Sequence, residues 1–307
     1  MKILIIRPAA LGDTLMLAPA LSAMQGLAEV SLVGRNPGLD LLKPYLLHSI
    51  DFDSPGWHHL FTEGSDEPLR PFIPPSHRVV AFLKDPQGLV ERNLGEWLPG
   101  AAIRLFEGYP AYGDKTHVAL YLARCLESAG APVEPEKTIE EAFLRPLLGR
   151  RPSSEGEGKI LFHPGSGGRQ KNHGPGFWIA MIRMFRHRLL RHARRLVILL
   201  GPAEEEDLHL YRGEQGCEGV QVLLSPGMQT LEEVLRGAAL YIGHDSGVTH
   251  LSAMLGTPTI ALFRTTSVQQ WKPIGPDVTV IEERESGPPL LEKVMAAAEG
   301  LLGKTKT

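Results

Sequence analysis

A strand, a turn, a helix and a second strand can be read in order from residues 2–34, KILIIRPAALGDTLMLAPALSAMQGLAEVSLVG. Residues 2–6 are an apolar run rich in β-branched side chains, and residues 30–33 are a similar run that ends at Gly34. Between them, Gly12 and Asp13 precede an Ala-, Leu- and Met-rich segment that is typical of a helix. This alternation predicts an α/β fold with a mostly parallel sheet and helices on both faces.

The alternation continues along the chain. We expect further strands at residues 78–83, 159–163, 196–200, 220–223, 240–243 and 259–263. We expect further helices at residues 115–128, from 176 onward, and at 204–212, 231–237, 248–255 and 289–302. Residues 149–158, GRRPSSEGEG, contain no apolar side chain and are the best candidate for a linker. We therefore predict two doubly wound domains, 1–152 and 153–307, with a last helix that can pack back on the first domain.

The composition is that of an ordinary globular protein. The 307 residues are 43% hydrophobic, and the net charge of −3 gives no signature of nucleic-acid binding. Cys125 and Cys217 stand far apart, so neither a zinc site nor a disulfide framework is expected. Arg7 and Asp13 interrupt the first apolar region, which disfavours a signal peptide, and no stretch approaches the ~20 apolar residues of a membrane span. We expect a cytoplasmic protein.

One local segment is strongly basic. Six arginines lie among apolar residues between Arg183 and Arg195, and the spacing predicts a basic amphipathic helix. Such a helix can lie against anionic lipid headgroups at the cytoplasmic face of a membrane, or it can simply be a solvated surface. The sequence leaves both interpretations open.

Two of the loops that follow predicted strands have several candidate functions. Asp13 follows Gly12 at the expected start of a helix, so it can be an N-cap, a catalytic carboxylate or both. Glu204 begins the predicted helix after the strand at 196–200, where it can bind ribose hydroxyls or interact with the helix dipole.

Two further loops are suited to phosphate groups. Residues 163–171, HPGSGGRQK, are rich in glycine, and their backbone N–H groups together with Lys171 can approach a diphosphate. They match neither the Walker nor the dinucleotide-binding pattern. Residues 243–250, GHDSGVTH, open a predicted helix, so N–H groups near Ser246 and Gly247 can bind an anion. The hydroxyls of Ser246 and Thr249 can add hydrogen bonds. Asp245 can instead be an N-cap, and His250 can be a structural histidine.

Taken together and in order, these loops resemble glycosyltransferase family 9, the bacterial heptosyltransferases of lipopolysaccharide core assembly. The resemblance rests on the opening at Ile6–Asp13, on His163–Ser166 with Lys171, and on Asp245–His250. The continuation GTPTIALF at residues 256–263 and the later Trp271-x-Pro273 also fit. The similarity covers nearly the whole chain.

The resemblance implies a GT-B fold, in which an N-terminal acceptor domain faces a C-terminal nucleotide-sugar domain across a cleft. It implies an inverting, metal-independent transfer without a cofactor, from an ADP-heptose to a lipopolysaccharide core or related acceptor that is lipid-linked or an oligosaccharide. Asp13 would be the general base and Lys171 would neutralise the leaving diphosphate. Glu204 would lie near the ribose, and the remaining donor-binding residues would be Ser166, Gly167, Gly168, Asp245, Ser246, Gly247, Thr249 and His250.

The chain departs from the family pattern at two places near these loops. Where the family commonly has Lys-x-Trp-Pro, this chain has Lys171-Asn-His-Gly-Pro175, with one extra residue and no tryptophan. Arg264 follows Phe263 where a glycine is usual. These departures leave open a degenerate nucleotide-binding protein without turnover. A nucleotide-sugar epimerase or hydrolase on the same scaffold also stays open, because His163, His173 and His250 could supply the groups that it needs near the anomeric carbon.

Overall fold

The computed structural model of the chain describes residues 1–63, 73–149, 158–189, 195–215, 219–283 and 287–304. These residues form two compact units, Met1–Ala142 and Phe143–Thr307. The expected boundary at residue 152 lies outside the described residues and stays a prediction. On its N-terminal side, the backbone N–H groups of Leu147 and Leu148 both bond to the carbonyl of Met254, within the second unit.

The first unit is built on a five-stranded sheet, with order β3-β2-β1-β4-β5. All four neighbouring pairs are parallel. The strands are β1 (Lys2–Ile6), β2 (Glu29–Gly34), β3 (His48–Asp51), β4 (Arg78–Phe82) and β5 (Ala102–Phe106). Sequence analysis found β1, β2 and β4 but missed β3 and β5, whose side chains are mostly half-buried or exposed.

The expected helix at residues 14–26 is divided into two. The pieces are α1 (Leu11–Leu15) and α2 (Ala18–Met24), with Pro19 in the first turn of α2. Proline lacks an N–H and collides with the preceding turn, so it starts a helix more readily than it continues one. The other helices of this unit are α3 (Gly38–Leu42), α4 (Leu89–Trp97), α5 (Val118–Ser128) and α6 (Pro135–Ala142).

The second unit contains a six-stranded sheet with order β11-β10-β9-β6-β7-β8, again with every neighbouring pair parallel. The strands are β6 (Lys159–His163), β7 (Leu196–Leu200), β8 (Val220–Leu224), β9 (Ala238–His244), β10 (Thr259–Phe263) and β11 (Val278–Glu282). All but β11 were expected from the sequence. The prediction of an α/β architecture with parallel sheets is therefore confirmed.

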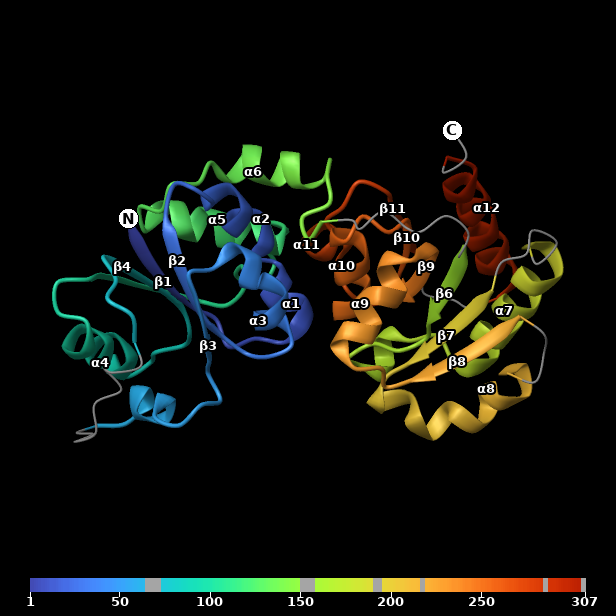
Figure 1. Cartoon of the computed structure of the whole chain (residues 1–307), viewed down its shortest axis with the longest axis horizontal. Helices are drawn as coiled ribbons and strands as arrows, with labels where there is room; N and C mark the ends of the chain where they lie inside the picture. The colour runs from blue at the N-terminus through green and yellow to red at the C-terminus, as the bar shows by residue number, and fades with distance from the viewer. Residues whose placement is uncertain (64–72, 150–157, 190–194, 216–218, 284–286, 305–307) are drawn as a thin grey trace. The chain divides into compact units, whose positions relative to one another are not determined.

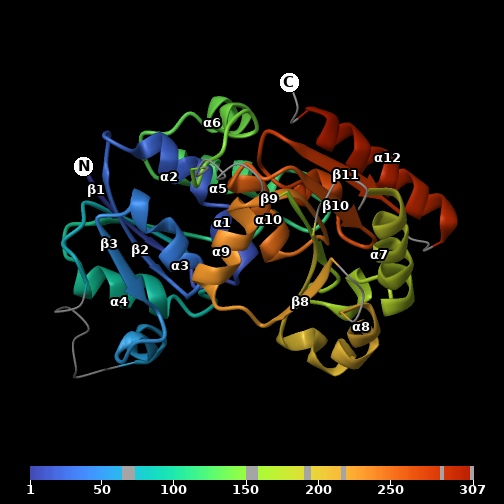
Figure 2. The same ribbon diagram turned by 45° about the vertical axis from the view of Figure 1, so that its right-hand side comes forward.

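Helices cover both faces of this second sheet (Figure 1). They are α7 (Pro175–Leu189), α8 (Leu208–Gln215), α9 (Met228–Arg236), α10 (Gly247–Met254), α11 (Val268–Trp271) and α12 (Pro288–Lys304). Helices α7, α8 and α12 share one apolar core with the strands, whereas α9 and α10 lie on the other side of the sheet (Figure 2). Core residues of α12 such as Val294 and Ala298 are fully buried in that cluster.

The strand orders decide where ligands can bind. Each sheet has a central strand from which the chain winds first to one side and then to the other. The reversal falls between β1 and β4 in the first unit and between β6 and β9 in the second. A crevice opens at such a point beside the carboxyl ends of the strands. Residues 164–171 follow β6, residues 245–250 follow β9 and include the first turn of α10, and Asp13 lies in α1, the helix after β1.

Candidate functional site

In the second unit, three predicted site residues form a chain of polar contacts at this point. The Nζ atom of Lys171 lies 3.0 Å from Oδ2 of Asp245, and Nε2 of His250 lies 3.4 Å from Oδ1 of the same carboxylate. Burial would raise the pKa of Asp245, but the hydrogen bond from His250 and the charge of Lys171 outweigh it and lower that pKa to about 2. Asp245 is therefore an ionised group that orients Lys171 and His250.

The first turn of α10 carries a cluster of hydroxyl groups. Ser246 is the N-cap, and its Oγ accepts the N–H of Thr249. The Oγ atoms of Ser246 and Thr249 are 3.0 Å apart, and Thr249 Oγ1 is also 3.0 Å from the hydroxyl of Tyr241. Because Ser246 occupies only one of the early N–H groups, those of Gly247 and Val248 have no partner within the helix. Such N–H groups suit an anion.

The buried hydroxyl of Tyr241 connects this turn to β6. It lies 2.9 Å from Nδ1 of His163, the last residue of that strand. The hydroxyl of Thr249 donates to the carbonyl of His244, so it must accept from Tyr241, and Tyr241 in turn must accept from His163. Burial lowers the pKa of His163 to about 4, so the imidazole is neutral at physiological pH. Tyr241 and His163 thus fix the hydroxyls at the start of α10.

Glu204 lies at the wall of a pocket of about 260 Å³ in the second unit. Its Oε2 accepts the N–H of Gly201 at 3.0 Å, so the carboxylate caps its own helical turn, while its binding of ribose hydroxyls stays a prediction. It is 8% exposed, and burial raises its pKa. A Cβ on Gly165 would come within 2.2 Å of this carboxyl group, which explains the glycine. The other wall is formed by residues of the turn that carries Lys171.

Both departures from the family pattern meet at that turn: residues 171–175 belong to it, and Arg264, which follows β10, bonds to it. Arg264 donates to the carbonyl of Asn172 at 2.5 Å, while the side chain of Asn172 accepts the hydroxyl of Ser166. The arginine that replaces glycine therefore tethers the turn after β6, and Ser166 holds the same turn from the other side. Ser166 is thus engaged within the loop, and Gly167 and Gly168 lie beside it.

His173 stands at the position of the family tryptophan. Its backbone N–H donates to Nε2 of His244 at 2.8 Å, and its ring lies 4.6 Å from that of Phe177. Burial, and then the charge of Arg264, lower the pKa of His173 to about 4. Burial also lowers the pKa of His244, to about 3. The two rings are therefore neutral packing groups under the Lys171 turn.

In the first unit, Asp13 lies in the first turn of α1 but does not cap it. Ala10 is the N-cap residue and makes no side-chain capping bond, so the expectation of a capping aspartate is wrong. Asp13 is half-buried, and its carboxylate accepts a hydrogen bond from Tyr109. Free of a capping role, it is available for proton transfer.

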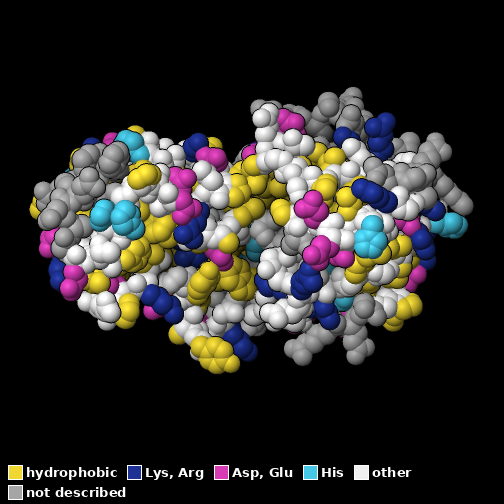
Figure 3. All heavy atoms as spheres, turned by 90° about the horizontal axis from the view of Figure 1, so that it is seen from below, with side chains coloured by type: hydrophobic (Ala, Val, Ile, Leu, Met, Phe, Trp, Pro, Cys, Tyr) yellow, Lys and Arg dark blue, Asp and Glu magenta, His cyan; other side chains and the backbone are white. Residues whose placement is uncertain are grey.

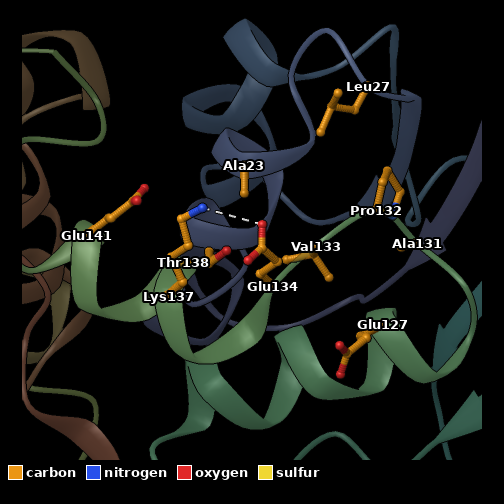
Figure 4. Close-up of a pocket in the computed structure, with 10 residues that line it drawn as sticks. All are labelled: Ala23, Leu27, Glu127, Ala131, Pro132, Val133, Glu134, Lys137, Thr138 and Glu141. Carbon is orange, nitrogen blue, oxygen red and sulfur yellow. Dashed lines mark hydrogen bonds and ion pairs between the residues drawn. The ribbon is translucent and has the colours of Figure 1, made fainter.

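Another pocket of the first unit lies away from Asp13. It has a volume of about 580 Å³ and is lined by α2, α5, α6 and the turn between the last two. Figure 4 shows Leu27 on one side and the ion pair of Lys137 with Glu134 on another. Leu27 precedes β2, so this pocket is at the amino ends of the strands. Ligands of parallel α/β sheets bind at the opposite ends.

On the face shown in Figure 3, the acidic and basic side chains of the described residues are interspersed. Within the described ranges, no group of three or more His, Cys, Asp or Glu side chains is placed to hold a metal ion. No helix in the described part of the chain has the length and apolar character to cross a membrane.

The basic segment expected to be a helix is only partly described. Helix α7 ends at Leu189, and Arg191 and Arg194 lie outside the described residues. Within the helix, Arg183 and Arg186 both pair with Glu214, and Arg188 pairs with Glu292 at 2.8 Å. Much of the basic charge of α7 is thus already balanced by the protein.

Comparisons with known proteins agree with this geometry. The family model for glycosyltransferase family 9 (heptosyltransferase) matches residues 114–298, which is more than half of the chain. The chain belongs to glycosyltransferase family 9. Over 87 residues it is 33% identical to lipopolysaccharide heptosyltransferase 3 of Escherichia coli, a match that spans 27% of this chain and 26% of that relative.

Solved structures show that the fold of this family 9 member extends over the whole chain. The E. coli ADP-heptose lipopolysaccharide heptosyltransferase II has a TM-score of 0.70, with 17% identity and 100% of each chain covered. The E. coli heptosyltransferase WaaC with ADP has a TM-score of 0.68, with 17% identity, 98% of this chain and 100% of that chain covered. At this identity the likeness establishes the fold.

The structure also identifies residues that sequence analysis did not assign to the site. Tyr241 and Arg264 support the segments after β6 and β9, and Arg7 and Tyr109 contact Asp13. Arg7 and Arg264 each directly follow a strand, and that position was the available signal. Nothing in the sequence marks Tyr109, which comes three residues after a strand that was not predicted.

Proposed function

We propose that this family 9 protein transfers a sugar, in particular heptose from an ADP-heptose, to a lipopolysaccharide core or related glycan acceptor. The observation that carries the proposal is the Lys171–Asp245–His250 chain beside the first turn of α10. It places a cation and unpaired N–H groups at the crevice of the second sheet. An α/β crevice of this kind suits a nucleoside diphosphate.

The donor would lie with its diphosphate at Lys171 and α10 and its nucleoside toward Glu204. The pocket beside Glu204 is also lined by Glu206 and Asp207, so it disfavours phosphate and suits hydroxyl groups. When the bond from the anomeric carbon to the diphosphate breaks, negative charge develops on the diphosphate. Lys171 and the N–H groups of Gly247 and Val248 would stabilise that charge, and such stabilisation is commonly a major catalytic contribution.

Asp13 would remove the proton from the acceptor hydroxyl as that oxygen attacks the anomeric carbon. A single displacement of this kind inverts the anomeric configuration, and it needs neither an enzyme nucleophile nor a metal ion. The location of the protein in the cytoplasm, and a contact of α7 with the membrane surface, are part of the same proposal.

The test is a thermal-shift and calorimetric titration with ADP, UDP, GDP, dTDP and NADH. A ligand that binds only the folded state at about 100 Kd adds ~2.7 kcal/mol of stability. We expect selective stabilisation by ADP, lost in Lys171→Ala and retained in Asp13→Asn. Preference for UDP would discard ADP-heptose as the donor, and absence of nucleotide binding would favour the degenerate binding protein.

A second measurement separates the transferase from the epimerase. Purified protein is incubated with ADP-heptose, first without and then with a deacylated lipopolysaccharide core acceptor, and the products are resolved by NMR. A transferase leaves the donor intact until the acceptor is added and then forms an inverted glycosidic bond. Conversion of the sugar without acceptor, retained in Asp13→Asn, would support the epimerase or hydrolase instead.

A further inference from the structure

Arg7 is a buried cation at the crevice of the first sheet. It follows β1 directly and is 2% exposed. Its Nη1 donates to the carbonyl of Gly108 at 2.8 Å, and its Nε donates to the backbone carbonyl of Asp13 at 3.2 Å. No described carboxylate forms an ion pair with it, although its charge lies close enough to interact with Asp13. The guanidinium thus connects the loop after β1 to the loop after β5.

Two aromatic rings hold this guanidinium between them. Its central carbon lies 5.4 Å from the ring centroid of Phe82 and 5.5 Å from that of Tyr109. Distances of this size are typical of cation–π contacts. The planar group is therefore fixed by hydrogen bonds at its edge and by rings on its faces, and Tyr109 is fixed in return.

Tyr109 completes a path from Arg7 to the Asp13 side chain. The Tyr109 hydroxyl hydrogen-bonds the Asp13 carboxylate, and burial together with the Asp13 charge raises the pKa of this phenol. Because the phenol stays protonated at neutral pH, it is the donor and the carboxylate is the acceptor. Arg7 thus holds the Asp13 backbone, and Tyr109 holds the Asp13 side chain.

We propose that Arg7 and Tyr109 are positioning residues for Asp13, with Tyr109 fixing the carboxylate so that one oxygen stays free for the acceptor hydroxyl. This inference rests on the proposed role of Asp13 as general base. A carboxylate without such a contact rotates freely, and catalysis falls when a reacting group leaves its productive geometry.

The direct test is Tyr109→Phe, which keeps the ring over Arg7 and removes the hydroxyl. We expect kcat to fall about tenfold, the size of one hydrogen bond to a charged group. The KM for the donor and stabilisation by ADP should stay unchanged. Tyr112→Phe is the matched control because Tyr112 is fully exposed. Equal kcat in the two variants would overturn the proposal.

Arg7 is tested through a double-mutant cycle. Lysine keeps the charge of Arg7 but lacks the planar fork that reaches both carbonyls. If Arg7 acts through Tyr109 and Asp13, Arg7→Lys lowers kcat, and the double variant with Tyr109→Phe loses less than the product of the single losses. Fully multiplicative losses, with unchanged thermal stability, would mean that Arg7 has no positioning effect through Tyr109.

A measurement without turnover separates this inference from the proposed function. The ring signal of Tyr109, assigned with Tyr109→Phe, is followed by NMR from pH 8 upward in wild-type protein and in Asp13→Asn. Because the Asp13 charge raises the pKa of Tyr109, ionisation should begin at lower pH in Asp13→Asn. An unchanged onset would refute the contact itself. A shifted onset in a protein that transfers no sugar would reject only the role of Asp13 as base.

Discussion

The ammonium of Lys171 lies 3.0 Å from the carboxylate of Asp245, which is 74 residues further along the chain. The partners differ in exposure, since the Lys171 side chain is 33% exposed and that of Asp245 is 5% exposed. The Lys171 side chain can therefore turn toward solvent or a ligand, whereas the buried Asp245 carboxylate is held in place. A bound diphosphate would compete with Asp245 for the same ammonium group.

The stability lost when this ammonium group is removed should depend on pH. The pKa of Asp245 is lowered to about 2, so the stability that it contributes is present above about pH 4 and is lost as the pH falls through 2. We expect Lys171→Met to lower the free energy of unfolding by about 1–2 kcal/mol at pH 7, and by less near pH 3. Urea unfolding at both pH values tests this, with exposed Lys115→Met as control. An equal loss at both pH values would contradict the ion pair.

The buried histidines should destabilise the protein in mild acid. His163 and His173 have pKa values lowered to about 4, and His244 to about 3, against 6.5 for free imidazole. Below about pH 6.5 the unfolded chain binds protons at these histidines, whereas the folded chain binds them only near pH 4. The free energy of unfolding therefore falls as the pH drops through this range.

His173→Phe isolates one part of this effect. It should make the free energy of unfolding less dependent on pH between 6.5 and 4, because one buried imidazole has been removed. The measurement is urea unfolding at several pH values, and Tyr211→Phe, which removes no group that titrates in this range, is the control. If the free energy of unfolding changed with pH equally in wild type and His173→Phe, His173 would bind its proton at the same pH in the folded and unfolded chains.

Two glycines near the pocket beside Glu204 should respond differently to alanine. A Cβ on Gly165 would come within 2.2 Å of the Glu204 carboxyl group, whereas one on Gly176 meets nothing within 4 Å. Since Glu204 can move, Gly165→Ala should leave the protein folded but displace that side chain. We expect ADP affinity to fall about tenfold in Gly165→Ala and to stay unchanged in Gly176→Ala, by calorimetry. Similar ADP affinities in the two variants would show that Glu204 does not contact the nucleoside.

The proposed membrane contact predicts sedimentation with anionic vesicles. Reversing the charge at Arg188, Arg191 and Arg195 should abolish it, because each basic residue near an anionic surface contributes about 1 kcal/mol. Arg188 is paired with Glu292, so Glu292→Gln should strengthen the sedimentation by freeing this cation. Neutral vesicles are the control. An unchanged pellet after charge reversal would leave α7 as an ordinary solvated helix.

Much of the fold could be predicted from the sequence because apolar runs and turn residues are local signals. The central strands β1, β6, β7, β9 and β10 are almost fully buried, so each appears as a short apolar run. The edge strands β3, β5 and β11 are only half-buried or exposed and carry no such run. The first-turn position of Asp13 was misjudged because Ala10 begins α1 without a capping side chain.

The candidate site was predictable in its parts but not in its contacts. The sequence identified Lys171, Glu204 and residues 245–250 because they lie in segments that follow predicted strands. It did not indicate that Arg264 would tether the Lys171 turn through Asn172, or that Tyr109 would contact Asp13. These contacts join residues that lie far apart along the chain, and no local pattern encodes them.

The sequence by itself determined an α/β chain with a parallel architecture and the chemistry of its loops. Only the tertiary structure decided the strand order, and with it the crevice beside β6 and β9 where Lys171 meets Asp245. It also decided that Arg7 is enclosed by Phe82 and Tyr109 and not exposed to solvent. The physical reason is that periodicity and turn chemistry act over a few residues, whereas strand pairing and burial depend on contacts between segments distant in sequence.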